Sequence, residues 1–226
     1  MEVGPKHVGI ILDGNRRYAK KHNLNPLSGH EHGIKIIHGL FDWAKELEIK
    51  EMSLYAFSTE NFNRNKEEVE YLMNIFLEEF DNLLESDKLE KEQIRVRFIG
   101  RINLFDKKIK DKMEELMEKT KDYDKFAVNF CMAYGGRAEI VDSVNKLIKQ
   151  GVKEIDEQMI FDNLYLKSEP DLIIRTSEQR LSNFLMWQGA YSEIIFLPNL
   201  LWPEFSKQDL ADCVEEFKRR KRRYGE

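Results

Sequence analysis

Cysteine, proline and glycine are scarce in this sequence, and repeats are absent. The 226 residues include 2 Cys, 5 Pro and 12 Gly. Cys131 and Cys213 lie far apart without metal-type spacing, so we expect two buried thiols rather than a disulfide or a zinc site. No low-complexity tract or Gly/Ser-rich linker divides the chain. We therefore expect a single domain over residues 1–226.

Long apolar runs and an excess of positive charge are missing as well. No stretch approaches the roughly 18 apolar residues of a membrane span, and residues 1–6 lack the hydrophobic core of a signal peptide. A cytoplasmic protein is the expectation. The formal charge is 36 minus 41, or −5, which argues against a general nucleic-acid-binding protein.

The stretch from His7 to Tyr18 is the one around which we expect the fold to be organised. Val8–Leu12 is an almost unbroken apolar run, typical of a strand buried on both faces of a parallel sheet. Asp13 ends the run, and the composition from residue 15 onward predicts a helix start with two arginines. Helix N-termini and guanidiniums bind phosphate oxygens, and a neighbouring acid can hold Mg²⁺. The turn predicts a diphosphate site, with helix capping by Asp13 as the plain alternative.

Strand and helix patterns alternate along the rest of the chain. Apolar runs predict strands over 51–57, 94–99, 126–132, 171–174 and 193–196. Helical spacing predicts helices over 34–47, 69–84, 103–121 and 138–148, and a last helix with Ser206 as its N-cap. This alternation predicts an α/β fold with a mainly parallel central sheet flanked by helices.

Polar residues follow these strands where ligands of parallel sheets bind, at the carboxyl ends. They are Asp13, Asn15, Arg16 and Arg17, then Ser58, Glu60, Asn61 and Arg64, then Arg137, and finally Arg175 and Arg180. Each arginine taken singly is better explained as a solvated loop residue. Because several strand ends agree, we predict a polyanionic, phosphate-bearing substrate. The apolar stripe over 69–84 is by itself more typical of plain core than of a lipid-binding wall.

Several segments together resemble the cis-prenyltransferases, the family of undecaprenyl and dehydrodolichyl diphosphate synthases. They are His7-x-x-x-Ile11-x-Asp13-Gly-Asn-Arg-Arg-Tyr-Ala19, Gly29-His30-x-x-Gly33, Tyr55-Ala-Phe-Ser-Thr-Glu-Asn-Phe-Asn-Arg64, Tyr134-Gly-Gly-Arg137, Asp171-Leu-Ile-Ile-Arg-Thr-Ser177, Arg180-Leu-Ser-Asn-Phe-Leu-Met-Trp-Gln188 and Leu201-Trp-Pro-Glu-Phe205. The likeness runs in order from residue 7 to residue 225. Arg16 and Tyr18, in place of Gly and Trp, resemble the archaeal and eukaryotic branch.

The resemblance implies a reaction, its substrates and a fold. Family members condense isopentenyl diphosphate with an allylic diphosphate of the farnesyl or geranylgeranyl type, and each condensation forms a new cis double bond. The product is a Z-polyprenyl diphosphate, a precursor of glycosyl carrier lipids. Mg²⁺ is the implied cofactor, and the growing chain lies in an apolar tunnel. The resemblance also implies a homodimer, because residues of one subunit close the other subunit's site.

The same resemblance assigns roles to residues. Asp13 matches the essential acid and metal ligand, Asn61 the proposed proton relay, and Glu193 a metal ligand that reaches the partner subunit's site. The matching substrate-binding residues are Gly14, Asn15, Arg16, Arg17, Tyr18 and His30 for the allylic diphosphate; Ser58, Thr59, Glu60, Phe62 and Arg64 for a mobile segment over the substrates; Arg175, Arg180, Leu181 and Ser182 for isopentenyl diphosphate; and Arg223 and Gly225 for the partner's site.

Besides the milder changes at Arg16 and Tyr18, this chain departs from the family pattern at two places. Pro26 stands where members carry an arginine before the Gly-His pair, which puts one allylic-diphosphate contact in doubt. The loop Arg175-Thr-Ser-Glu-Gln-Arg180 is one glycine short. Loss of a glycine changes which positive-φ conformations the loop adopts, so Arg180 is expected to be placed differently.

Three other functions are alternatives to this one. A haloacid-dehalogenase-like phosphatase needs a second Asp two positions from the first, but residues 11 and 15 are Ile and Asn. A subunit of a heteromeric prenyltransferase, with weak or no activity alone, is favoured by the two departures and opposed by Asp13, Asn61 and Glu193. A nucleic-acid binder using residues 218–223 is opposed by the net charge, and contact of that segment with a membrane surface is the better explanation.

Overall fold

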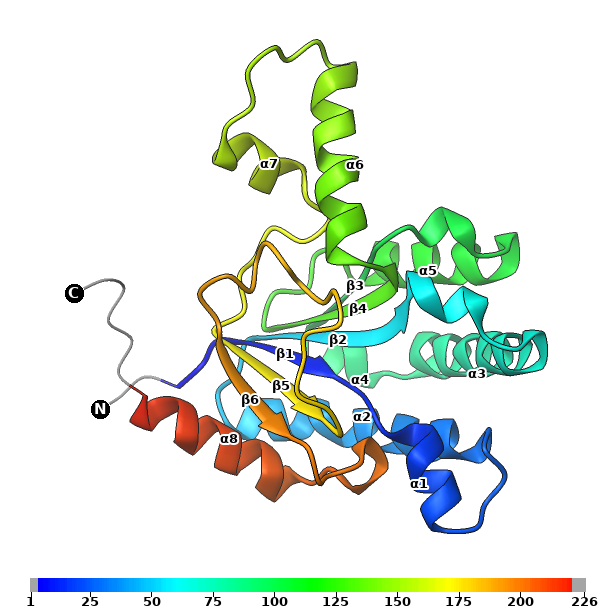
Figure 1. Ribbon diagram of the computed structural model, residues 1–226. Coiled ribbons are helices and arrows are strands. Elements are labelled where there is room, and N and C mark those ends of the chain that lie inside the picture. The colour runs from blue at the N-terminus through cyan, green and yellow to red at the C-terminus, as the bar shows by residue number, and fades with distance from the viewer. Residues whose placement is uncertain (1–3, 221–226) are drawn as a thin grey trace.

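A six-stranded parallel sheet forms the centre of the molecule. The computed structural model describes residues 4–220, and in it the strand order is β3-β4-β2-β1-β5-β6 with every pairing parallel (Figure 1). The strands are β1 (His7–Ile11), β2 (Glu51–Ser58), β3 (Ile94–Ile99), β4 (Phe126–Tyr134), β5 (Leu172–Thr176) and β6 (Glu193–Leu197). The predicted α/β class with a parallel sheet is confirmed.

Helices connect the strands and cover the sheet. They are α1 (Asn15–Lys21), α2 (Ser28–Glu46), α3 (Lys66–Glu85), α4 (Lys88–Lys91), α5 (Lys107–Thr120), α6 (Gly136–Lys149), α7 (Glu157–Asn163) and α8 (Lys207–Arg219), with 3₁₀-helices η1 (Thr59–Asn63), η2 (Ile102–Leu104) and η3 (Trp202–Glu204). Helices α6 and α7 form an arm that projects from the body (Figure 1). No helix within residues 4–220 is long and apolar enough to cross a membrane.

Some helices begin or end at residues other than those predicted from the sequence pattern. Helix α2 starts at Ser28, a turn and a half before the apolar pattern begins, because Gly29 and Gly33 let it pack against Asn15 at the start of α1. The charged segment 103–121 divides into η2 and α5, and α7 has no counterpart among the predictions. Helix α8 begins as predicted, with the Ser206 side chain accepting a hydrogen bond from the Asp209 N–H.

Apolar residues fill both faces of the sheet. The larger core lies between the sheet and helices α2, α3, α5 and α8, and it contains the apolar face of α3. A smaller core on the other face is covered by the loop that holds Phe184 and Leu185. Cys131 and Cys213 are buried free thiols, as predicted. Burial on both faces accounts for the apolar composition of β1.

The carboxyl ends of β1, β2 and β5 meet at one edge because these neighbouring strands run parallel. β1 turns into α1 at Gly14, whose φ of +119° is the left-handed region that favours glycine. A Cβ at this position would lie 2.5 Å from Ser177 Oγ, so the turn also needs the missing side chain. Gly14, and not Asp13, is the N-cap of α1. The alternative role of Asp13 as a helix cap is therefore wrong, and its carboxylate is available to the pocket.

Candidate active site

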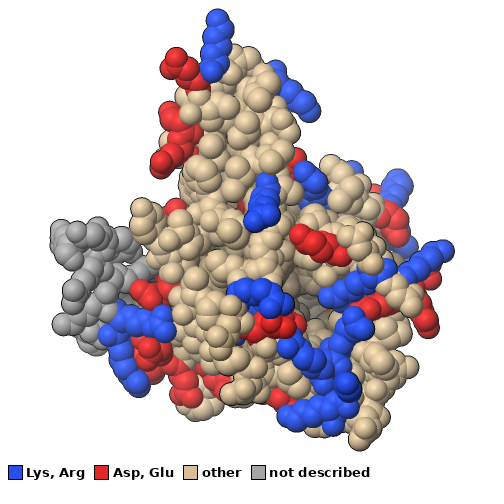
Figure 2. Space-filling model, viewed as in Figure 1, with Lys and Arg blue, Asp and Glu red and all other residues tan. Residues whose placement is uncertain are grey.

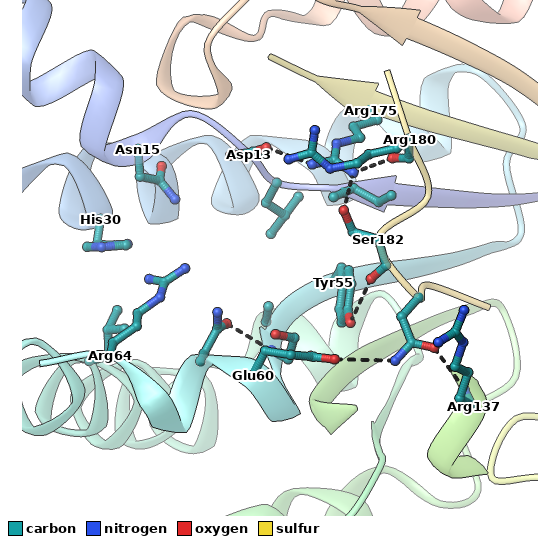
Figure 3. A pocket seen from close by; sticks show the side chains of 17 residues that line it. Asp13, Asn15, His30, Tyr55, Glu60, Arg64, Arg137, Arg175, Arg180 and Ser182 are labelled. Carbon is teal, nitrogen blue, oxygen red and sulfur yellow. Dashed lines mark hydrogen bonds and ion pairs between the residues drawn. The ribbon is translucent and has the colours of Figure 1, made fainter. Parts of the chain in front are cut away.

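Two adjoining pockets open at this edge of the sheet. Their volumes are about 620 and 930 Å³, which is the size range of small-molecule sites. Between them they are lined by most of the residues predicted from the sequence, which are Asp13, Gly14, Asn15, Arg16, Arg17, His30, Ser58, Glu60, Asn61, Arg64, Arg175, Arg180 and Ser182 (Figure 3). Lys and Arg side chains gather on the face where α1 lies, at lower right in Figure 2. The ligand edge is basic although the chain is acidic overall.

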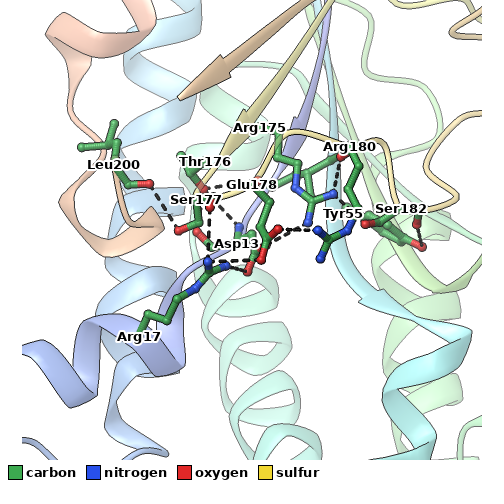
Figure 4. Close-up of polar contacts among 11 residues, drawn as sticks. Asp13, Arg17, Tyr55, Arg175, Thr176, Ser177, Glu178, Arg180, Ser182 and Leu200 are labelled. Carbon is green, nitrogen blue, oxygen red and sulfur yellow. Dashed lines mark hydrogen bonds and ion pairs between the residues drawn. The ribbon is translucent and has the colours of Figure 1, made fainter. Parts of the chain in front are cut away.

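Asp13 is held between two arginines. Arg175 Nη2 lies 2.9 Å from Asp13 Oδ2, and Arg17 Nη2 lies 3.0 Å from Asp13 Oδ1 (Figure 4). The backbone of Asp13 is fixed as well, because the Thr176 hydroxyl donates to its carbonyl oxygen at 2.6 Å. The Asp13 side chain is still 30% exposed. The acid thus presents a fixed carboxylate to the pockets.

Arg175 is buried and organises the loop that follows β5. Its Nη1 donates to the Arg180 carbonyl oxygen and, at 2.6 Å, to the Ser182 hydroxyl. Ser177 takes a φ of +71°, so a residue other than glycine adopts the left-handed conformation in the shortened loop. Arg180 still lines the pocket, with its side chain 63% exposed. The loop therefore brings Arg175, Arg180 and Ser182 to one wall, despite the missing glycine.

Glu178 is a site residue that the sequence patterns did not single out. Its carboxylate lies 3.2 Å from Arg17 Nη1 and also pairs with Arg180. It bridges an arginine that follows β1 and one that follows β5. An acid in this position occupies guanidinium donors that suit phosphate oxygens.

Glu68, on the first turn of α3, is a second residue that was missed. It is buried and lies 2.9 Å from Arg64, 3.8 Å from Arg16 and 3.4 Å from His30 Nε2. Burial lowers the pKa of His30, the charge of Arg64 lowers it further, and Glu68 opposes them. His30 is therefore a neutral imidazole at neutral pH. The i, i+4 spacing of Arg64 and Glu68 was the signal in the sequence.

The segment after β2 is fixed by its own side chains. Asn61 Oδ1 accepts from the Ser58 N–H at 2.9 Å and caps η1, which leaves the Asn61 amino group for other contacts. Burial opposes ionisation of Glu60, but hydrogen bonds from its own backbone, Ser58, Thr59 and Asn183 outweigh burial and lower its pKa. Hydrogen bonds therefore favour the ionised form of Glu60.

Asn183 was also missed, and it joins three segments. Its side chain donates to Glu60 at 3.5 Å and accepts from the Arg137 N–H at 2.8 Å, while its carbonyl oxygen accepts from the Gly136 N–H at 2.7 Å (Figure 3). It takes a φ of +67°. Asparagine tolerates the left-handed region better than most residues, which suits it to this position.

Five predicted site residues do not line either pocket. Tyr18 packs its ring on His22, with 4.3 Å between ring centroids, and Phe62 packs on Phe57 at 4.9 Å. Thr59 donates to Glu60, and Leu181 packs against the smaller core. The fifth is Glu193, described next. Arg223 and Gly225 lie outside the described residues.

Glu193 lies at the opposite edge of the sheet from Asp13. Strand register places it level with Leu172 and Val8, at the start of β6, where Arg220 Nη1 pairs with it at 3.0 Å. Asp13 is five residues beyond Val8, a span of about 16 Å for extended chain at roughly 3.3 Å per residue. The two acids of one chain cannot share one cation. Within residues 4–220, no three His, Cys, Asp or Glu side chains come together as a metal site.

An apolar cavity begins beside the polar pockets. Ala56 lines both the smaller pocket and this cavity, which lies between α2, α3 and the sheet and is otherwise walled by Ile34, Ile37, His38, Phe41, Phe76, Glu79, Phe80, Leu83, Phe130 and Met132. Phe126 is not in this wall. Its ring packs behind that of Phe41, with 6.0 Å between centroids. An apolar cavity thus occupies the place expected for a tunnel.

Comparison with known proteins gives one consistent result. Residues 11–225 match a family model described as "Putative undecaprenyl diphosphate synthase". The chain is 45% identical to an isoprenyl transferase of Thermotoga maritima, over 98% of this chain and 97% of the relative. It is 44% identical to a tritrans,polycis-undecaprenyl-diphosphate synthase (geranylgeranyl-diphosphate specific) of Pyrococcus horikoshii, over 99% and 88%.

A solved structure agrees over the whole chain. The crystal structure of lavandulyl diphosphate synthase from Lavandula x intermedia, in complex with dimethylallyl diphosphate, superposes with a TM-score of 0.93. That protein is 32% identical, and the match covers 100% of both chains. The relatives come from a bacterium, an archaeon and a plant, so they do not single out one branch.

Proposed function

The chain belongs to the undecaprenyl diphosphate synthase family of prenyltransferases, and we propose that it extends an allylic diphosphate primer with isopentenyl diphosphate to form a Z-polyprenyl diphosphate. The observation that carries the proposal is that the polar pockets and the apolar cavity adjoin each other. Asp13 and its arginines face polar pockets, and Ala56 joins the smaller of these to an apolar cavity. A substrate with a diphosphate head and an isoprenoid tail needs both environments.

The primer diphosphate is assigned to the wall formed by Asn15, Arg16 and Arg17. These residues follow β1, and Arg17 is already directed at Asp13. Bidentate guanidinium contacts stabilise the negative charge that develops as the carbon–oxygen bond to the diphosphate breaks. The alkene of the second substrate then attacks the allylic carbon, and a proton is lost. No covalent nucleophile is needed.

Isopentenyl diphosphate is assigned to the wall formed by Arg175, Arg180 and Ser182. Arg175 fixes the other two, so this wall is preorganised. Glu178 pairs with Arg17 and Arg180, and phosphate oxygens would displace it from those donors. Asn61, whose amino group is free of its cap, is assigned to the relay through which the proton lost by isopentenyl diphosphate passes to the departing diphosphate.

Magnesium is the cofactor in this proposal, and Asp13 would hold it. Mg²⁺ prefers one or two carboxylates, with phosphate oxygens and water completing an octahedron. Asp13 fits, because its partly exposed carboxylate lines both pockets where diphosphate would supply further oxygens. A bound Mg²⁺ polarises the leaving diphosphate. Asp13 would exchange an arginine contact for the cation.

We propose a homodimer in which Glu193 serves the partner's site. The separation of Asp13 and Glu193 along one chain supports a contribution in trans, since neither edge alone carries both acids. Assembly with a different prenyltransferase subunit is the alternative. The primer is proposed to be of the farnesyl or geranylgeranyl type, and the Pyrococcus relative named above, with its geranylgeranyl specificity, supports the longer primer. A cytoplasmic location, with contact to a membrane surface, stays a prediction from the sequence.

One assay tests the proposed reaction. Purified chain is incubated with Mg²⁺, labelled isopentenyl diphosphate and either farnesyl or geranylgeranyl diphosphate, and label extracted into butanol is measured. We expect label in the organic phase only when primer and Mg²⁺ are both present. The product double bonds are then assigned by NMR. A folded dimer that incorporates no label with either primer would contradict the proposal and favour the heteromeric alternative.

A further inference from the structure

The apolar cavity has two polar residues in its wall, and they bond to each other. His38 on α2 and Glu79 on α3 lie 2.7 Å apart, from Nε2 to Oε2, with side chains 57% and 23% exposed. The flanking wall residues are apolar. Ile34, Ile37 and Phe41 line the cavity from α2, and Phe76, Phe80 and Leu83 line it from α3. The pair thus closes the solvent side of the cavity, where the two helices face each other.

Other polar contacts continue this closure along the two helices. Tyr71 on α3 donates to Glu31 near the polar pockets. At the far end, Lys88 Nζ on α4, the short helix that follows α3, lies 2.8 Å from Asp42 on α2. His38–Glu79 is the link between these two that also lines the cavity. We call His38 and Glu79 the side clasp.

The cavity as observed is too small for an isoprenoid chain. Its volume is about 60 Å³. An engineered cavity that binds benzene has a volume of roughly 150 Å³. A polyprenyl tail is much larger than benzene, so part of the wall must move when a tail enters. The part of the wall that moves should be the one whose displacement costs the least free energy.

Two parts of the wall differ in what holds them. At the inner end, Phe41 is buried, and Phe126 packs against it. Displacing a packed ring strains a close-packed interior. The side clasp is a hydrogen bond between two partly exposed side chains, and both groups can bond to water when they are apart, so the contact contributes little to stability. The wall therefore yields more easily between α2 and α3 than at its inner end.

We propose that the side clasp is a lateral gate, and that the tail of a growing chain leaves the cavity between α2 and α3 when His38 and Glu79 separate. The inference rests on the proposed function, because it concerns the tail of that reaction's product. Product length then depends on how readily the clasp opens. Early condensations, whose tails are still short, need less of this opening than late ones.

Cross-linking across the clasp tests the gate. In the full-length His38→Cys/Glu79→Cys variant, the two introduced thiols are joined by a short bis-maleimide. The native cysteines are buried, and reagent-treated wild-type protein controls for them. A matched variant, Asp81→Cys/Lys112→Cys, receives the same reagent across an exposed α3–α5 pair that is 2.9 Å apart and does not line the cavity.

We expect the clasp cross-link to shift products to shorter chains while the rate of the first condensation is retained. The matched cross-link should leave both unchanged. The charge-repulsion variant His38→Glu should shift products to longer chains, and the exchange His38→Glu/Glu79→His should restore the original distribution. Circular dichroism verifies the fold of each variant.

Two outcomes would overturn the gate. One is an unchanged product distribution in the cross-linked, active enzyme. The other is loss of the first condensation in parallel with long products, which would show that the link acts on the polar site. If untreated wild-type protein incorporates no label, the proposed function fails instead, so the two failures are distinguishable.

Discussion

Ala56 lines both the smaller polar pocket and the apolar cavity, but the side chains that form the polar pockets and those that form the cavity are arranged differently. In the pockets, charged side chains are held in defined positions before any substrate binds, as Asp13 is by Arg17 and Arg175. In the cavity, aromatic rings fill nearly all the space. Fixed charges lower the reorganisation needed when charge develops in a reaction.

The difference shows which part of the protein must move. A preorganised charge site loses activity when atoms shift, whereas a nearly filled cavity can take a tail only by opening. Chemistry and product length should therefore respond to different substitutions.

Removal of the acid should affect chemistry alone. Asp13→Ala is expected to lower turnover by at least about 100-fold, the loss seen when one strong electrostatic contact to a transition state is removed. Asp13→Asn is the matched control for size, and it keeps an acceptor for Arg175. The chain lengths of any residual product should not change. Normal turnover in a variant with an unchanged circular dichroism spectrum would exclude Asp13 from the mechanism.

Mixing two inactive variants should restore activity, because we expect the polar pockets, unlike the apolar cavity, to need a residue from a second chain. Asp13→Ala and Glu193→Ala homodimers are each expected to be nearly inactive. After subunit exchange, a mixed dimer keeps one site with both acids, so part of the activity should return. Exchange is verified with differently tagged chains. A mixture as inactive as its components, despite exchange, would argue against shared sites.

Substitutions at the inner end of the cavity should change product length without changing the first condensation. Phe41 lines the cavity, whereas Phe126 packs against Phe41 and does not line the cavity. Phe41→Leu is therefore expected to lengthen products more than the matched Phe126→Leu. Mass analysis of the products measures the shift. A larger effect at Phe126 would place the floor behind Phe41.

The pH dependence of the free energy of unfolding should report on His30, which lines both polar pockets. Burial, more than the charge of Arg64, lowers the pKa of His30 in the folded protein. The pKa of this histidine in the unfolded chain is about 6.5, so below that pH the unfolded chain binds a proton that the folded protein does not. The free energy of unfolding therefore decreases as the pH falls from the unfolded pKa through the lower pKa of the folded protein. Denaturant midpoints at pH 7.5 and 5.5 measure the loss. His30→Gln should show a smaller loss, and an equal one would remove His30 as a cause.

The amino-acid sequence alone is enough to predict the class of fold and the edge of the sheet where the site lies. Alternating apolar runs and helical stripes predict a parallel sheet, and parallel strands bring residues at their carboxyl ends together. Asp13 and Arg175 are 162 residues apart, yet both follow β-strand patterns, so their meeting could be predicted. Period and strand direction are local properties that a sequence shows directly.

The partners of these residues become visible only in the folded molecule. Glu68, Glu178 and Asn183 are recognised by what their side chains reach, and those contacts depend on loop conformation and helix packing. Whether Asp13 and Glu193 lie at the same edge depends on strand register, and the wall of the cavity depends on how α2 and α3 face each other. These are distances between segments far apart in the chain, and they are set by the packing of the whole molecule rather than by the pattern of any one segment.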